Sequence, residues 1–437
     1  MNSLVNVAKT EFGFDSTMNK SHNCDAYIFV PAYSWNEKHY YYLINTKDSK
    51  ITRWVIDIQT AKNKLKDFMR ENFDHTWDDS VLDAFNFAFV PHSSIYHKGK
   101  IYVSGVNSYY IIVLDLCTDS YEVIVDNEMK MISSTNTIID DHLIYARYSV
   151  SDRVDNIKNE TPMKAETVSY DLNVKSWKVV NEYECINILH SVAVTPDKKF
   201  TISISTTSNP NVEFLENSKE MYKDKDYMRK MFAAGLKKSQ IHIHNNESKK
   251  LKVIDLYNTP AHIEYDLHDP SLCYISSHSL GVNAYDGFVY SFGKSSINKL
   301  HLKEEPEIIG VYEEMDFLRI PSHKLFTYKN KKLIAATVYP YQIHVIDYDT
   351  MSIYKKIHLE DKKYSTDFSD GPFKYPRVDS TPFSVHPVSD TPYMYLVGGR
   401  GVKLYNHETN VVECVIPYNK FKDPISVLGH SVLFDQI

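Results

Sequence analysis

Short apolar segments alternate with polar turns along the whole chain. In seven places two apolar segments flank a turn rich in Asn, Asp, Ser or Lys. β-Branched and aromatic residues on both sides of such a turn are typical of a β-hairpin. The hairpins recur about every 48 to 72 residues, a spacing that propeller blades with insertions show. The seven predicted hairpins span residues 41–54, 112–123, 168–179, 241–253, 288–300, 345–356 and 403–414.

A second kind of hairpin precedes most of these, as in residues 92–105, 190–205 and 323–337. Each repeat therefore has four strands, A to D, which make the blade of a β-propeller. The first repeat lacks strand A, and residues 424–434 supply an apolar segment of that kind, which would cover an exposed edge. We predict an all-β protein, a seven-bladed β-propeller of residues 1–437 closed by its C-terminal strand. The alternative is two β-sandwich domains, but seven matched repeats favour a ring.

Four long insertions separate the predicted strands, and all of them fall in D–A or B–C connections. They comprise residues 61–88, 149–164, 208–238 and 361–380. The first has a pattern that predicts two helices, and the third contains an amphipathic helix. In a propeller these connections lie on the face where strand A begins. We predict that they form a lid there, since long loops on a rigid scaffold often bind ligands. The alternative is that they only cap the ring.

Composition and charge narrow the classes of function. Hydrophobic residues make up 43% of the chain, and its 33 Tyr and 20 Phe favour strands. The net charge is −7 and basic residues form no run, which argues against a nucleic-acid partner. No apolar stretch reaches the length of a membrane span. The five cysteines are widely spaced, and the N-terminus does not resemble a signal peptide, so we predict a cytoplasmic protein with reduced thiols.

Histidine recurs at the starts of the predicted A strands. Strand A is the innermost strand of a blade, so side chains at its start converge near the channel axis. Aligning these starts places His at four of seven positions, although only 19 of the 437 residues are His. Neutral imidazole binds Fe, Zn, Cu and Ni, and rigid strands would preorganise the ligands. A channel that holds only water is the alternative. The candidate metal ligands are His92, His190, His262 and His323.

A seven-bladed propeller with four histidines on its axis resembles the carotenoid cleavage oxygenases. This resemblance implies a non-haem Fe(II) held by the four histidines. The motifs that flank the ligands in that family are not evident, so the resemblance implies no substrate. Residues 262–279, HIEYDLHDPSLCYISSHS, are similar to the His…Asp-Pro…His segment of oligogalacturonate lyases, which are also seven-bladed and metal-dependent. That second resemblance adds His278 as a candidate catalytic residue.

The ends of the predicted B strands reach the same mouth of the propeller. An arginine there can bind a carboxylate or phosphate of a substrate, although a surface salt bridge explains a single arginine equally well. Glu264 and Asp266 alternate with His262, and we expect one of them to hydrogen-bond a ligand imidazole. We take His278 and Arg400 as candidate catalytic residues. The residues at these strand ends are Arg147, His278, Tyr339 and Arg400.

The sequence therefore predicts a metal-dependent enzyme that acts on a small organic, anionic substrate. Fe(II) is the leading ion, with Mn(II) and Zn(II) as alternatives. The second hypothesis is a metal-dependent polysaccharide lyase, and the third is a non-catalytic propeller that binds a protein or peptide. Metal content distinguishes the third from the others, and oxygen dependence distinguishes the first from the second.

Overall fold

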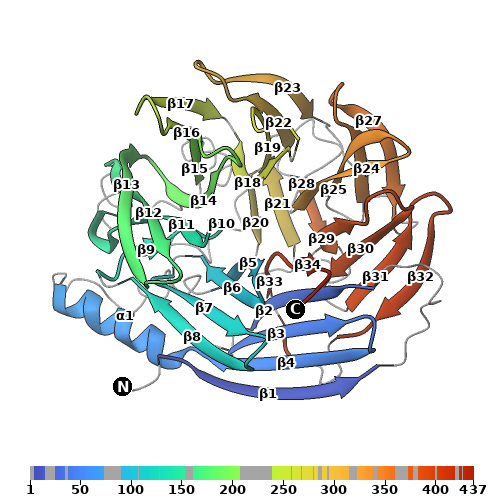
Figure 1. Cartoon of the computed structure of the whole chain (residues 1–437), viewed down its shortest axis with the longest axis horizontal. Helices are drawn as coiled ribbons and strands as arrows, with labels where there is room; N and C mark the ends of the chain where they lie inside the picture. The colour runs from blue at the N-terminus through green and yellow to red at the C-terminus, as the bar shows by residue number, and fades with distance from the viewer. Residues whose placement is uncertain are drawn as a thin grey trace. The chain divides into compact units, whose positions relative to one another are not determined.

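The structure of the protein is a computed structural model. It describes residues 4–14, 25–34, 38–72, 90–106, 108–126, 128–152, 161–206, 239–256, 258–266, 268–278, 280–283, 288–292, 295–313, 322–338, 342–359, 373–376, 382–398, 401–418, 423–425 and 427–437. The chain is a seven-bladed β-propeller, which confirms the predicted fold class (Figure 1). It divides into two compact units. Unit 1 comprises residues 1–135, 326–330 and 379–437, and unit 2 comprises residues 136–325 and 331–378.

Unit 1 contains the sheets of the first, second and seventh blades. The strand orders are β1-β4-β3-β2-β33, β5-β6-β7-β8 and β29-β30-β31-β32. Strand β1 is an extra outer strand that pairs with β4 along its whole length. The strands are β1 (Asn6–Gly13), β2 (Tyr27–Ser34), β3 (Lys38–Asn45), β4 (Lys50–Asp57), β5 (Pro91–His97), β6 (Lys100–Gly105), β7 (Tyr110–Asp115), β8 (Ser120–Val125), β9 (Met131–Ile132), β29 (Pro382–Pro387), β30 (Tyr393–Gly398), β31 (Gly401–Asn406), β32 (Val411–Ile416), β33 (Val427–Leu428) and β34 (Val432–Phe434).

The C-terminal segment completes the first blade. Strand β33 pairs with β2 at Ala32 and Leu428, and β34 pairs with β2 at Ile28 and Leu433. The predicted closure by the C-terminal strand is therefore confirmed. The edge of β2 needs this partner because buried backbone N–H and C=O groups are costly without hydrogen bonds.

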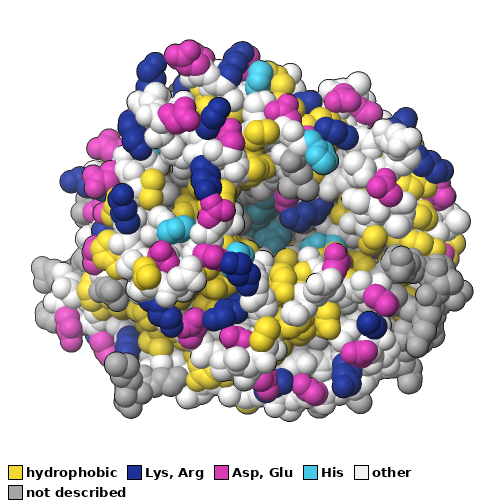
Figure 2. Space-filling model, viewed as in Figure 1, with side chains coloured by type: hydrophobic (Ala, Val, Ile, Leu, Met, Phe, Trp, Pro, Cys, Tyr) yellow, Lys and Arg dark blue, Asp and Glu magenta, His cyan; other side chains and the backbone are white. Residues whose placement is uncertain are grey.

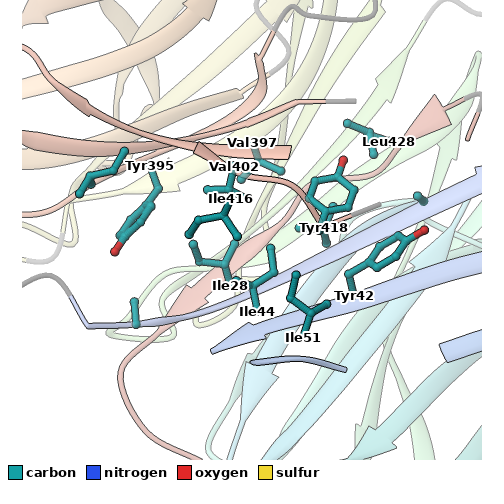
Figure 3. Packing of buried hydrophobic residues seen from close by; sticks show 14 of the residues in the cluster. Ile28, Tyr42, Ile44, Ile51, Tyr395, Val397, Val402, Ile416, Tyr418 and Leu428 are labelled. Atoms are coloured by element: carbon teal, nitrogen blue, oxygen red, sulfur yellow. The ribbon is translucent and has the colours of Figure 1, made fainter. Parts of the chain in front are cut away.

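The core of unit 1 packs the first blade against the seventh. Ile28, Ile44 and Ile51 lie beside Val402 and Ile416 (Figure 3), and Leu404 belongs to the same cluster; all six residues are fully buried. Successive side chains of a strand point to opposite faces, so every second residue of β2, such as Ile28 and Val30, faces this core. Tyr42 and Tyr418 add aromatic area, with ring centroids 4.9 Å apart. This core holds the innermost strands of the two blades in place, together with the residues at the beginning of each strand.

Unit 2 contains the sheets of blades three to six and one small additional sheet. The strand orders are β10-β11-β12-β13, β14-β15-β16-β17, β18-β19-β22-β23, β24-β25-β26-β27 and β20-β21-β28. The strands are β10 (Thr137–Ile139), β11 (His142–Tyr148), β12 (Met163–Asp171), β13 (Ser176–Cys185), β14 (Ile188–Val194), β15 (Phe200–Thr206), β16 (Ser239–Asn245), β17 (Leu251–Leu256), β18 (Thr259–Tyr265), β19 (Leu272–His278), β20 (Leu280–Asn283), β21 (Phe288–Phe292), β22 (Ser296–His301), β23 (Glu307–Glu313), β24 (Ser322–Tyr328, in unit 2 up to Leu325), β25 (Lys331–Val338), β26 (Gln342–Asp347), β27 (Ser352–His358) and β28 (Phe373–Pro376).

The small sheet corrects one predicted hairpin. Residues 288–300 were expected to form the C and D strands of the fifth blade. Instead β21 pairs with β20 and β28, and the C–D hairpin is β22–β23. Two apolar strands flank a short polar turn in both arrangements, so the local pattern does not distinguish them. β28 lies far from β21 in the sequence, so the tertiary structure and not the local sequence decides their pairing.

The predicted insertions are described only in part. Residues 59–72 form helix α1 (Gln59–Asn72), which begins after Asp57, whose side chain accepts a hydrogen bond from the Gln59 N–H at 2.9 Å. This confirms the first of the two helices predicted near residues 61–88. Residues 73–88, 153–160, 208–238, 361–372 and 377–380 of these insertions lie outside the described residues, so the lid stays a prediction.

Side chains of both charge signs are interspersed over the face shown in Figure 2. Among the described residues, no helix is long and apolar enough to cross a membrane. The four cysteines that the structure describes are free thiols.

Six of the seven turns between strands C and D are stabilised by the same side-chain-to-backbone hydrogen bonds. The last residue of strand C is Asp or Asn, and its Oδ1 accepts hydrogen bonds from the backbone N–H groups two and three residues later. The residue four positions later adopts a positive φ of 52° to 60°. Such Asx turns explain the recurrence of Asp and Asn there. The turn residues are Asn45, Asp115, Asp171, Asn245, Asp347 and Asn406.

The positive φ angles lead to a prediction. Lys249 has a φ of 59°, where a Cβ atom is strained and Gly is not. Lys249→Gly should raise the free energy of unfolding by about 0.5–1 kcal/mol. Lys252→Gly, in extended strand β17, should lower it by a similar amount, since Gly weakens strands. Urea unfolding of both variants checks this. A loss of stability in Lys249→Gly would contradict it.

Candidate metal centre

Two of the candidate ligands occupy bulges at the starts of A strands. In β5 the pairing passes from Pro91 with Gly105 to Ser93 with Ser104, so His92 is the extra residue. In β14 it passes from Leu189 with Ser205 to Ser191 with Ile204, so His190 is the extra residue. A bulge re-aims the side chain of its extra residue. His92 and His190 therefore hold the same structural position.

The third candidate holds a different position. In β18 the extra residue is Ala261, and His262 pairs with Ser276. The corresponding extra residue of β29 is Phe383. The prediction that the four histidines share one equivalent position is therefore wrong for His262, which lies one residue later. Sequence alignment missed this because the residue at which a bulge falls depends on the pairing with the next strand.

The strand pairing of unit 2 nevertheless brings three histidines together. The rings of His190 and His262 lie edge to face with centroids 5.2 Å apart, and a ring nitrogen of each lies within 4.8 Å of the other. The rings of His262 and His278 are 5.9 Å apart. His278 reaches this place because it pairs with Thr259 at the start of β18.

Hydrogen bonding orients the His190 ring. Its Nδ1 donates to the carbonyl oxygen of Ala261 at 2.9 Å, and the Ser191 hydroxyl donates to the same oxygen. With the proton on Nδ1, the lone pair of the neutral ring is on Nε2. Histidine ligands commonly use this arrangement, in which a backbone carbonyl fixes the tautomer and the other nitrogen binds the metal.

The other two candidate ligands lie in different surroundings. His323 is 1% exposed, and its Nε2 donates to the carbonyl oxygen of Tyr274 at 3.3 Å. Burial lowers the pKa of His323 to about 4. His92 belongs to unit 1, where its ring lies 5.0 Å from that of His430. Sequence alignment missed His430, because it placed Ile425 at the start of the closing strand.

The expected acidic partners of the site form other interactions. Glu264 forms an ion pair with Lys324. Asp266 accepts a hydrogen bond from the Tyr348 hydroxyl and lies 3.5 Å from the Lys332 ammonium. The structure therefore does not support the expectation that one of these carboxylates hydrogen-bonds a ligand imidazole.

Of the two arginines predicted at the ends of the B strands, the structure describes only Arg147. Arg147 is 1% exposed, contacts the Glu166 carboxylate with Nε and Nη2 at 2.7 Å, and lies over the Trp177 ring at 4.5 Å. Its charge is thus paired within its own sheet, by an ion pair in which the arginine is buried, whereas the alternative expected a surface salt bridge. Arg400 and Tyr339 lie outside the described residues.

Comparisons with known proteins add little to this geometry. No family model matches the chain, and no curated protein matches it. Among solved structures it is similar to the computationally designed Ika8 protein, with 10% identity and a TM-score of 0.39 over 73% of this chain and 71% of that one. It is also similar to a chain of a nidogen/laminin complex, with 10% identity and a TM-score of 0.39 over 77% of this chain and 99% of that one.

Proposed function

We propose that this protein is a metal-dependent enzyme whose ion is bound by His190 and His262. The observation that supports this most is the approach of the two rings together with the carbonyl that orients His190. His278 is a third candidate donor in unit 2, with its ring centroid 5.9 Å from that of His262. That His92 or His323 joins them stays a prediction.

The donor set favours a transition metal. Imidazole nitrogens suit Fe, Zn, Cu and Ni, whereas Mg and Ca prefer oxygen ligands. We propose Fe(II) first, with Mn(II) and Zn(II) as alternatives. Such an ion would supply Lewis acidity. Neutral imidazoles leave its double charge uncompensated, which favours a small anionic substrate. The free cysteines support a reducing, cytoplasmic location within this proposal.

A lyase is the second candidate function. The proximity of His262 and His278 agrees with the similarity of residues 262–279 to the oligogalacturonate lyase segment. The aspartate of that segment, Asp269, accepts hydrogen bonds from the Ser271 N–H and hydroxyl within a turn. A lyase would cleave an anionic polysaccharide in a reaction that does not need O2. An oxygenase would consume O2 during its reaction.

Metal analysis tests the proposal directly. Protein purified without a histidine tag should contain one transition-metal ion per chain, or bind one when Fe(II), Mn(II) or Zn(II) is added. His190→Ala and His262→Ala should each lower the occupancy at least tenfold, because each removes a ligand. His92→Ala and His323→Ala test the two ligands that remain predictions.

His358→Ala is the matched control, since His358 is an exposed histidine at the end of β27. It should bind metal like the wild type, and all variants should keep the β-rich circular dichroism spectrum. A folded wild-type protein that neither contains nor binds a metal would exclude the proposal. The non-catalytic propeller that binds a protein or peptide would then be the leading account.

A further inference from the structure

The fourth blade has one apolar face and one polar face. Along β15 and β16, Ile alternates with Ser or His. Ile202, Ile204, Ile241 and Ile243 pack against the fifth blade, at residues such as Cys273, Ile275 and Leu300. The opposite face holds the polar residues, because successive side chains of a strand point to opposite sides. They are Ser203, Ser205, His242 and His244.

This polar face is turned toward the third blade within unit 2. The ring of Tyr183, on β13, lies 4.9 Å from the rings of both His242 and His244. Thr167 pairs with Asn181, two residues before Tyr183, so both side chains share the face of Tyr183. Six of these seven residues are buried, and Asn181 is partly exposed.

Many polar atoms in this layer make no hydrogen bond of normal geometry within the protein, although the Tyr183 phenol interacts with the Ser203 and Thr167 hydroxyls, and the His242 ring with the backbone of Glu184 and Ser203. A buried polar atom without a partner is costly, so native proteins satisfy nearly all of them. Eight such atoms lie in this one layer. They are Thr167 Oγ1, Asn181 Nδ2, Tyr183 Oη, Ser203 Oγ, Ser205 Oγ, His242 Nδ1, His242 Nε2 and His244 Nε2.

We propose that the layer between the third and fourth blades is a binding site for ordered water molecules that bridge these hydroxyl, amide and imidazole groups. The set mixes hydrogen-bond donors and acceptors, which a water molecule with two to four polar partners matches. It includes no carboxylate, so a divalent cation would be buried without a compensating charge.

The chemistry of the individual groups agrees with a neutral ligand. Burial lowers the pKa of both His242 and His244 to about 4, so both rings are neutral at pH 7. Burial raises the pKa of Tyr183, and hydrogen-bonding interactions with the hydroxyls of Ser203 and Thr167 partly offset this. Those hydroxyls are therefore close to the phenol, and one water molecule can bridge all three.

A crystal structure at about 1.5 Å resolution tests the proposal. Ordered water should lie about 2.7–3.2 Å from at least two of the eight atoms. An anomalous-scattering peak between His242 and His244 would overturn the proposal in favour of a metal ion. A dry layer in which the side chains bond one another directly would overturn it as well.

Ser203→Ala and Ser205→Ala give an independent test through the sign of the change in melting temperature. If water bonds these hydroxyls, each substitution should lower the melting temperature by about 2 °C. If the hydroxyls have no partner, their removal should raise it, because an unsatisfied buried group is removed. Ser108→Ala is the control that should lower it, since the buried Ser108 hydroxyl donates to the Tyr110 carbonyl at 2.8 Å. A rise in both variants would overturn the proposal.

Discussion

Deleting residues 424–437 is expected to abolish soluble, cooperatively folded protein. The deletion removes β33 and β34, the partners of β2, and exposes the edge of the first blade. It also removes Leu428 from the core and the hydrogen bond of 2.7 Å between Ser431 and His386 of the seventh blade. Losses of this kind exceed the total stability of about 5–15 kcal/mol that a folded domain has.

Expression, size-exclusion chromatography and thermal unfolding measure the effect. Deleting only residues 435–437, which are exposed, is the control and should leave the melting temperature unchanged. A folded 424–437 deletion variant with the wild-type transition would refute the role of the closing segment.

A point substitution gives a graded version of this experiment. A Cβ atom on Gly429 would lie 2.6 Å from the Pro91 carbonyl oxygen and 2.9 Å from Pro31 Cγ. Gly429→Ala should therefore lower the free energy of unfolding by about 1–3 kcal/mol, as overpacking does. Gly13→Ala is the matched control, since its nearest neighbour is the Ser49 carbonyl oxygen at 3.7 Å, an ordinary contact.

Acidification from pH 7 to pH 4 is expected to destabilise the folded protein by several kcal/mol. Burial lowers the pKa of His242, His244 and His323 to about 4 and that of His344 to about 3. Between these values and 6.5, the value in the unfolded chain, the unfolded state binds more protons than the folded state. Stability is therefore full above about pH 6.5 and falls as the pH drops toward 4. Each histidine contributes up to about 3 kcal/mol.

Urea unfolding at pH 7, 6, 5 and 4.5 measures this dependence. His344→Gln should flatten it, because the variant lacks one buried group that protonates only on unfolding. His268→Gln, at an exposed position away from the buried histidines, should leave the slope unchanged. Equal stability of the wild type at pH 7 and pH 4.5 would contradict the prediction.

The sequence by itself determined the architecture of this protein. Hairpin periodicity predicted seven blades, and the apolar segment near residues 424–434 predicted the closure. Both follow from local rules, because strand alternation and Asx turns such as that of Asp347 depend on neighbouring residues. The candidate histidines His190 and His262 were also visible in the sequence.

Only the tertiary structure decided which histidines meet. A bulge at Ala261 rather than at His262 shifts one ligand by a residue, and its place depends on pairing with β19. The same pairing brings His278 beside His262, while His323 turns toward the Tyr274 carbonyl. The polar face of the fourth blade meets the third blade through Tyr183 for the same reason. Sequence periodicity tells which side chains share a face of a sheet, and packing between sheets decides what that face contacts.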